Sequence, residues 1–180
     1  MLGIGTNGGL IGPRRVPNGG SASGIWDLEE QKLAKGAGIW VRPLGTYSQS
    51  SLYSGATAAS RANMTNGSFT DTATATDAAT GGASAFVKVD YGESVYINTV
   101  TVGTATSNIP GGWNKDYTNN CLVQTSDDDS TWTTLFNTGT FATEGIFTFY
   151  GPGNFTPVNA RYVRIAKADA YVAVSEFYVN

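Results

Sequence analysis

The chain has 180 residues, of which 23 are glycine and 14% are charged, and its formal net charge is −3. A helix-rich protein uses more Leu, Glu, Lys and Arg than this chain does. A nucleic-acid-binding protein normally carries a basic stripe, whereas this chain has a negative net charge. The apolar fraction of 41% and the aromatic fraction of 12% are enough to build a core, but no apolar run is long enough to cross a membrane. The composition therefore predicts a soluble, β-rich protein.

The residue types that are missing narrow the chemistry. The chain has no histidine and a single cysteine, Cys121. Ser-His-Asp and Cys-His catalysis are therefore excluded within one chain, as are an intramolecular disulfide and a thiolate zinc site. The acidic run Asp127-Asp128-Asp129 is interpreted as a solvated turn. We expect no catalytic residues and no enzymatic activity.

Composition and charge divide the chain near Gly45. Residues 1–45 carry five basic and three acidic residues, whereas residues 46–180 carry six basic and eleven acidic residues. The first part is rich in glycine and interrupted by prolines, so it cannot bury a core by itself. We interpret residues 1–45 as an extended arm and residues 46–180 as the folded domain.

One short helix is predicted inside the arm, near residues 25–35. Either Ser23 or Asp27 is suited to cap its start. A helix of about ten residues is marginal alone, so we expect it to dock on the chain's own domain or on another protein. Trp26 and Trp40 favour the second alternative, because aromatic side chains are common interface anchors.

From about Tyr47 onward, apolar and polar residues alternate in short runs. Such runs occur at residues 87–91, 132–136, 147–149 and 172–179. Period-two runs separated by Gly, Asn, Asp and Pro clusters predict antiparallel strands. The predicted fold class is all-β, an antiparallel β-sandwich or jelly roll. Residues 70–84, a Thr/Ala/Gly tract without a period, are predicted to form a long ordered loop.

Four motifs follow one another in the second part of the chain. They are an Ala-Asn start with an Asn-Gly turn at 62–67, a strand, turn and returning strand at 86–100, a strand with a Ser-x-Asp turn and a tryptophan at 123–132, and two final strands at 160–165 and 174–177. In this order they resemble the discoidin-like, coagulation-factor C-type domain over residues 52–180. That family is a galactose-binding-like β-sandwich, which many carbohydrate-binding modules also use.

Several of these motif residues have structural explanations. Trp132 is expected to close one end of the core. Arg161 or Arg164 is expected to satisfy an internal carboxylate or carbonyl groups. We therefore place no ligand contacts at these positions.

The resemblance also implies a structural calcium ion, which family members often hold between an Asp-Gly turn and a glutamate on the last strand. The corresponding positions are Asn66, Thr72 and Glu176. Calcium prefers oxygen ligands that include carboxylates, and Asp71 can replace the aspartate for which this chain has Asn66. The alternative is that Glu176 pairs with an arginine and no metal binds.

Binding in the resembled fold is usually at loops at one end of the sandwich. In this chain Trp113 and Tyr117 are suited to stack on a sugar face, and Asn114 and Lys115 to bond its hydroxyl groups. Tyr171 is expected to lie beside them. The alternative is that these aromatic residues pack a long loop or contact a neighbouring subunit.

The arm carries a second resemblance. Residues 10–17 and 21–31 contain Gly-Pro-Arg and Ala-Ser-Gly-Ile-Trp-Asp-Leu-Glu-Glu-Gln, and they look like the opening of many phage virion proteins, where such a segment precedes variable sugar-binding or fibre domains. This resemblance implies an attachment module. The implied virion-anchoring residues are Arg14, Arg15, Ile25, Trp26, Leu28 and Trp40.

These resemblances together predict a non-enzymatic bacteriophage structural protein of the tail, a fibre or a head decoration. We expect the arm to bind other virion proteins, the chain to form a homo-oligomer, and the domain to face outward toward a host-surface glycan. Residues 1–5 lack the features of a secretory signal, so we expect synthesis in the host cytoplasm and assembly into the virion, with no membrane insertion and no nucleic-acid partner. The main alternative is a cellular carbohydrate-binding module or lectin.

Overall fold

The computed structural model describes residues 45–53, 56–68, 74–76, 85–106, 113–168 and 171–179. The chain divides into two units, Met1–Arg42 and Pro43–Asn180, and every described residue belongs to the second. The arm and its expected helix near residues 25–35 lie outside the described residues. Within the described part, no helix has the length and hydropathy needed to cross a membrane.

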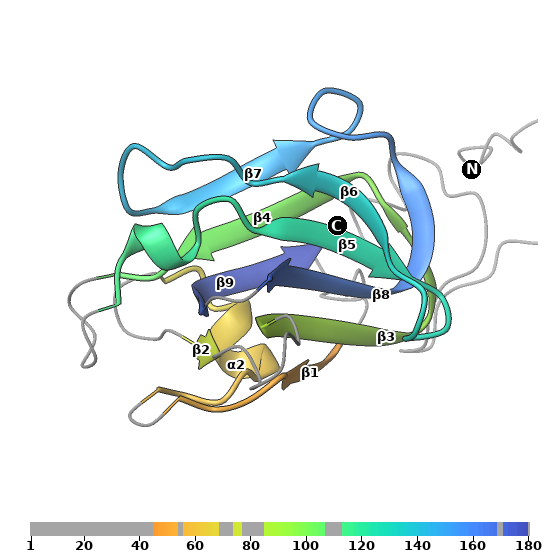
Figure 1. Cartoon of the computed structure of the whole chain (residues 1–180). Coiled ribbons are helices and arrows are strands. Elements are labelled where there is room, and N and C mark those ends of the chain that lie inside the picture. The colour runs from red at the N-terminus through yellow and green to blue at the C-terminus, as the bar shows by residue number, and fades with distance from the viewer. Residues whose placement is uncertain are drawn as a thin grey trace, which may run out of the picture. The chain divides into compact units, whose positions relative to one another are not determined.

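The described domain is a sandwich of two antiparallel sheets (Figure 1). The five-stranded sheet contains, in spatial order, β1 (Thr46–Gln49), β3 (Ala85–Ile97), β8 (Val158–Lys167), β5 (Leu122–Ser126) and β6 (Thr133–Asn137). The four-stranded sheet contains β2 (Thr74–Thr76), β9 (Val172–Val179), β4 (Thr99–Thr104) and β7 (Ile146–Tyr150). Two short helical segments, α2 (Arg61–Met64) and the 3₁₀ helix η1 (Lys115–Tyr117), complete the described elements. The prediction of an all-β sandwich is confirmed.

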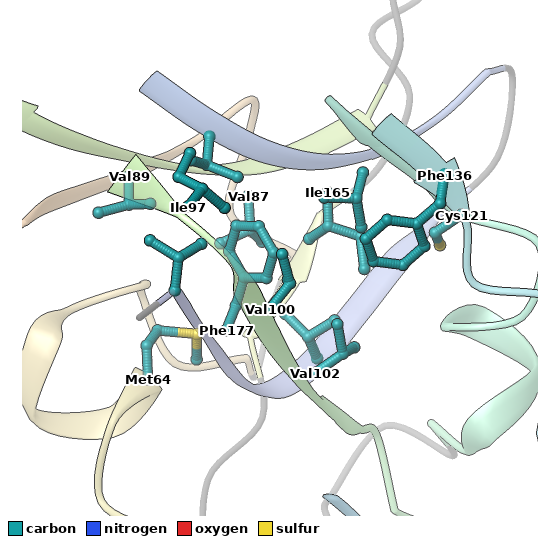
Figure 2. Close-up of a cluster of buried hydrophobic side chains, with 14 of the residues drawn as sticks. Met64, Val87, Val89, Ile97, Val100, Val102, Cys121, Phe136, Ile165 and Phe177 are labelled. Atoms are coloured by element: carbon teal, nitrogen blue, oxygen red, sulfur yellow. The ribbon is translucent and has the colours of Figure 1, made fainter. Parts of the chain in front are cut away.

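The core lies between the two sheets and follows the period-two pattern of the strands. Val87 and Val89 on β3 are fully buried, whereas Lys88 between them is half-buried. Phe177 of β9 is the largest fully buried side chain, and Figure 2 shows it among residues from both sheets. Burying each such side chain contributes about 1.5–3 kcal/mol. On β3, alternation therefore decides which face turns inward, whereas β4 and β9 are buried along most of their length on both faces.

The Thr/Ala tract at residues 70–84 was expected to be a loop, and that expectation is wrong at one point. Strand β2 forms inside the tract and pairs with β9 from Val172 to Val174. A strand this short needs no hydrophobic period of its own, because the neighbouring strand supplies its hydrogen-bond partners. The rest of the tract, residues 70–73 and 77–84, lies outside the described residues.

Trp132 does not close the core, which corrects the expectation from its motif. It precedes β6, is half-buried, and its ring centroid lies 4.0 Å from the guanidinium carbon of Arg164. Arg164 alternates with the buried Val163 and Ile165, so its side chain is on the outer face of the five-stranded sheet, where its Nε also donates to Gln124 at 2.8 Å. The cation–π contact thus holds the tryptophan on that outer face.

Arg161 satisfies a carboxylate, as expected, but the pair is on the surface and not internal. Its Nε and Nη2 donate to the two carboxylate oxygens of Asp90 at 2.8 and 2.9 Å. The hydrogen bond from Arg161 holds the pKa of Asp90 below its usual value. Both side chains are partly exposed, so water screens the pair and its contribution to stability is small.

Thr118, directly after η1, ties three segments together at one end of the sandwich. Its fully buried hydroxyl accepts a hydrogen bond from the N–H of Ala105 at 3.2 Å and donates to the C=O of Ala173 at 2.6 Å. Ala105 follows β4, and Ala173 lies near the start of β9. Figure 1 shows η1 at the end of the sandwich where β4 finishes and β9 begins. The hydroxyl therefore holds the β4–β5 connection against two neighbouring strands.

Replacing Thr118 by valine tests this tie, because Thr118→Val keeps the side-chain shape and removes the hydroxyl. Two buried backbone groups lose their partner, so we expect the free energy of unfolding to fall by about 2–4 kcal/mol. The control is Thr133→Val at an exposed position of β6, with an expected change within about 0.5 kcal/mol. Urea unfolding followed by circular dichroism measures both. Equal stability of Thr118→Val and the parent chain would contradict this role.

Candidate functional site

Four aromatic side chains meet at the end of the sandwich that Thr118 organises, and we call them the aromatic cluster: Tyr53, Trp113, Tyr117 and Tyr171. Tyr53 follows β1, Trp113 and Tyr117 belong to the connection between β4 and β5, and Tyr171 immediately precedes β9. Three segments that are distant in the sequence therefore converge. Loops held by a rigid scaffold are where binding residues are most often found.

Trp113 is the centre of the aromatic cluster. Its ring centroid lies 4.8 Å from that of Tyr53, 4.5 Å from that of Tyr117 and 5.7 Å from that of Tyr171, and the rings meet edge to face. Each such pair contributes about 0.5–1.5 kcal/mol beyond area burial. Trp113 is only 4% exposed, whereas Tyr171 is 42% exposed. Trp113 is thus the internal support, and Tyr171 is the ring that faces solvent.

The indole of Trp113 also brings a polar atom into the cluster. Its Nε1–H is buried and has no hydrogen-bond partner within the described part of the chain. A buried indole N–H normally finds an acceptor. Besides the three tyrosine rings, the fully buried Ala105 and Ala173 pack with Trp113. The cluster therefore contains a hydrogen-bond donor that the described fold does not use.

Polar side chains of η1 and β8 border the aromatic cluster. Asn114 caps η1, because its side-chain oxygen accepts from the N–H of Asp116 at 2.8 Å. Lys115 Nζ lies 3.2 Å from a carboxylate oxygen of Asp116, and Lys167 Nζ donates to the C=O of the same residue at 3.2 Å. Charged and amide groups are thus gathered around Asp116, the residue that precedes Tyr117.

Of the five residues that the sequence predicted for carbohydrate binding, the structure brings the rings of Trp113, Tyr117 and Tyr171 together. The other two, Asn114 and Lys115, lie between Trp113 and Tyr117 in the chain, and their side chains bond Asp116. Their ligand role stays a prediction, and the burial of Trp113 leaves its ring little surface on which a sugar can stack. Tyr53 was not expected in the site. No local pattern indicates this position, because Tyr53 meets Trp113 only through the tertiary fold, in which the segment after β1 packs against the β4–β5 connection.

The predicted metal positions are only partly described. Glu176 on β9 is fully buried, and its Oε1 accepts hydrogen bonds from the backbone N–H groups of Gly67 at 2.8 Å and Ser68 at 3.2 Å. Asn66 uses its side-chain oxygen to accept from Ser68 at 2.7 Å. Asp71 and Thr72 lie outside the described residues, as do the implied virion-anchoring residues Arg14, Arg15, Ile25, Trp26, Leu28 and Trp40.

The oxygen atoms of Glu176 and Asn66 are of the type that calcium binds, because a carboxylate and an amide oxygen are ligands that Ca²⁺ prefers. Among the described residues, Glu176 is bound by backbone N–H groups and not by an arginine guanidinium. No group of three or more His, Cys, Asp or Glu that can hold a metal occurs in the described ranges. Any calcium site here therefore depends on backbone oxygens and on residues beyond those ranges.

Two other residues with reactive side chains, Asp128 and Cys121, have structural roles. The backbone N–H groups of Thr131 and Ser130 donate to the Asp128 carboxylate at 2.7 and 2.9 Å, and these bonds hold its pKa well below the usual range. Asp128 is therefore an ionised turn-forming residue, in agreement with the interpretation of the acidic run. Burial raises the pKa of Cys121 to about 12, so its thiol is a packing group and not a nucleophile.

The fold is shared by many solved structures, including the following three. A fucolectin from striped bass (Morone saxatilis) serum has a TM-score of 0.57 at 14% identity, with 76% of this chain and 46% of that chain covered. The lectin domain of lectinolysin, complexed with Lewis B antigen, has a TM-score of 0.55 at 16% identity, with 76% and 92% covered. A Streptococcus pneumoniae fucose-binding module has a TM-score of 0.54 at 16% identity, with 74% and 88% covered.

The search of curated proteins gives no match. The family model described as NedA-like, galactose-binding domain matches residues 63–165, which is more than half of the chain. This range spans most of the described strands, from α2 to β8. The chain belongs to the family of NedA-like, galactose-binding domains.

Proposed function

We propose that the domain binds a glycan at the aromatic cluster without catalysing a reaction. One observation carries the proposal: rings from three distant segments converge on Trp113, and one of them, Tyr171, remains 42% exposed. A large aromatic side chain held open to solvent beside polar groups is typical of a ligand site. The family and the three similar folds, each named as a lectin or a sugar-binding module, support this proposal.

The chemistry of a sugar matches the two kinds of group at this end. Its ring presents an apolar face of C–H groups, which packs on the exposed ring of Tyr171. Its hydroxyl groups bond the nearby amide and ammonium groups of Asn114 and Lys115. Tyr117, half-buried against Trp113, extends the aromatic surface. Trp113 acts from inside by holding the rings at fixed angles.

Replacing the exposed ring tests the proposed binding site. We expect Tyr171→Ala to weaken binding to immobilised galactose- or fucose-terminated oligosaccharides by about tenfold or more, because the apolar contact is lost. Tyr96→Ala is the matched control, since Tyr96 is 60% exposed on β3 at the opposite end of the strands. Biolayer interferometry measures both affinities.

Two results would contradict the proposal. One is binding that Tyr171→Ala leaves unchanged, and the other is an equal loss in Tyr171→Ala and Tyr96→Ala. Because Tyr171 is partly exposed, its replacement should leave the thermal midpoint close to that of the parent chain, and a melting curve confirms that folding is intact.

A structural calcium ion belongs to the same proposal. Glu176 and Asn66 supply oxygens to it, with Asp71 and Thr72 as the further side chains and backbone carbonyls completing the set. The ion fixes the turn after α2 against β9. The buried position of Glu176 beside that turn supports this assignment.

Removing calcium tests the metal site. Because a ligand that binds only the folded state stabilises it, the melting temperature should be higher in excess calcium chloride than in excess chelator. Glu176→Gln should abolish that difference, while Glu93→Gln, at an exposed position of β3, should retain it. Identical melting temperatures of the parent chain with calcium and with chelator would rule the ion out.

The proposed setting of the domain is a bacteriophage particle, with residues 1–45 as the anchor and the chain in the tail, a fibre or a head decoration. The sequence of the arm supports this setting, together with the division of the chain into two units at residue 42. A cellular carbohydrate-binding module is the alternative. Copurification of the chain with phage particles distinguishes the two.

Truncation tests the role of the arm. A chain lacking residues 1–40 should remain soluble, keep the melting temperature of the domain and fail to join particles in a complementation assay. We expect folding to be kept because the core of the domain lies beyond residue 45. We expect incorporation to be lost because the arm holds the proposed anchoring residues. Normal incorporation of the truncated chain would overturn the proposed anchor.

A further inference from the structure

Strand β7 forms one edge of the four-stranded sheet. Among the described strands it pairs only with β4, in a regular register without a bulge. Its sequence, Ile-Phe-Thr-Phe-Tyr, contains no charge and no proline. Natural edge strands are usually blunted by charges, prolines or bulges, because an open edge is a template for another strand. By contrast, the edge strand β6 of the other sheet has a register shift against its neighbour.

The hydrogen bonds at the two ends of β7 show which backbone groups point outward. The N–H of Gly151 donates to the C=O of Asn98 at 2.8 Å, and the N–H of Thr104 donates to the C=O of Gly145 at 2.9 Å. In an antiparallel ladder, hydrogen-bonded and non-hydrogen-bonded pairs alternate. The odd-numbered residues of β7 therefore turn their N–H and C=O groups toward β4, and the even-numbered residues turn theirs away.

Asn154 closes one end of the outward-facing row. Its side-chain oxygen accepts from the N–H of Tyr150 at 2.9 Å, and its own N–H donates to the C=O of Tyr150 at 2.8 Å. It thus takes the place that a residue of a neighbouring strand would occupy beside Tyr150. The N–H and C=O groups of Ile146 and Thr148 remain as the outward-facing set.

We propose that this edge pairs with the β7 edge of a second copy of the chain, antiparallel and centred on Phe147. Ile146 then faces Thr148 of the partner subunit, and the reverse pair forms on the other side of the two-fold axis. Each pair exchanges two hydrogen bonds, so all outward groups of both residues are used. Cross-strand pairs of such side chains are favourable, and the partly exposed Ile146 becomes covered.

A second copy suits this edge better than an unrelated strand because the outward groups are their own complement. Ile146 and Thr148 each present one N–H donor and one C=O acceptor, and a two-fold rotation brings the same four groups of the second copy opposite them. The uncharged strand brings no like-charge repulsion when it meets itself. The tyrosine–asparagine closure at residues 150 and 154 stays intact in this register and limits the pairing to a short segment.

Sedimentation equilibrium and residue-resolved hydrogen exchange on the full chain test the dimer. The mass should rise with concentration from one to two copies of the 18.9 kDa chain. The amides of Ile146 and Thr148 should exchange about tenfold more slowly at high than at low concentration, since pairing protects them. The amides of Phe147 and Phe149, which face β4, should be protected at both concentrations.

A pair of variants at one position isolates the edge. Thr148→Pro removes an N–H that the pairing with β4 does not use, and proline is tolerated where the N–H of an edge strand faces outward. It should weaken association by about tenfold or more, while Thr148→Val, which keeps the N–H and the branched shape, should associate like the parent chain.

The proposal is overturned by a chain that stays monomeric at all concentrations, by a dimer whose Ile146 and Thr148 amides exchange at the monomer rate, or by a Thr148→Pro variant that dimerises normally. If circular dichroism shows that Thr148→Pro does not fold, the exchange rates of the parent chain decide the question by themselves.

Discussion

The loop end of this domain depends on the hydroxyl of one buried threonine. Thr118 accepts from the backbone after β4 and donates to the backbone of β9, so a single side chain bonds two buried backbone groups from different segments. Without it, each group would be buried unpaired, which costs about 1–3 kcal/mol per group. The same contact fixes the segment that carries Trp113 and Tyr117, and therefore positions the aromatic cluster. The stability of the fold and the placement of the candidate site are thus parts of one hydrogen-bond network.

In the aromatic cluster, one ring supports the others from inside and another ring faces the solvent. Trp113 is buried and meets its neighbours edge to face, whereas Tyr171 presents its ring to solvent. A ring that is already held at a fixed angle loses little conformational freedom when a ligand arrives, so more of the contact energy appears as affinity. The N–H of Trp113, which has no partner in the described part of the chain, lies inside the cluster. This arrangement gives the proposed glycan site a rigid aromatic surface.

The sequence predicted what local chemistry determines. Alternating residues on β3 placed Val87 and Val89 in the core, and the acidic run formed a turn around Asp128 as expected. Sequence reasoning failed where distant contacts decide. Trp132 lies outside the core, where Arg164 from another strand stacks on its ring. No pattern near Trp113 distinguishes a buried ring from an exposed one. The predicted rings of Trp113, Tyr117 and Tyr171 do meet, and their role as a site stays a prediction. Which ring is buried and which is exposed depends on packing with Tyr53, which no local pattern indicates.

In the proposed function, the glycan binds at the end of the sandwich where Trp113 lies. The chain has four tryptophans, so two-dimensional NMR resolves up to four indole N–H signals, and single Trp→Phe variants assign them. During titration with a galactose- or fucose-terminated oligosaccharide, the Trp113 signal should shift with ligand concentration, whereas that of Trp132, on the outer face of the five-stranded sheet, should stay in place. A Trp132 signal that shifts while that of Trp113 does not move at saturation would contradict glycan binding at this end of the sandwich.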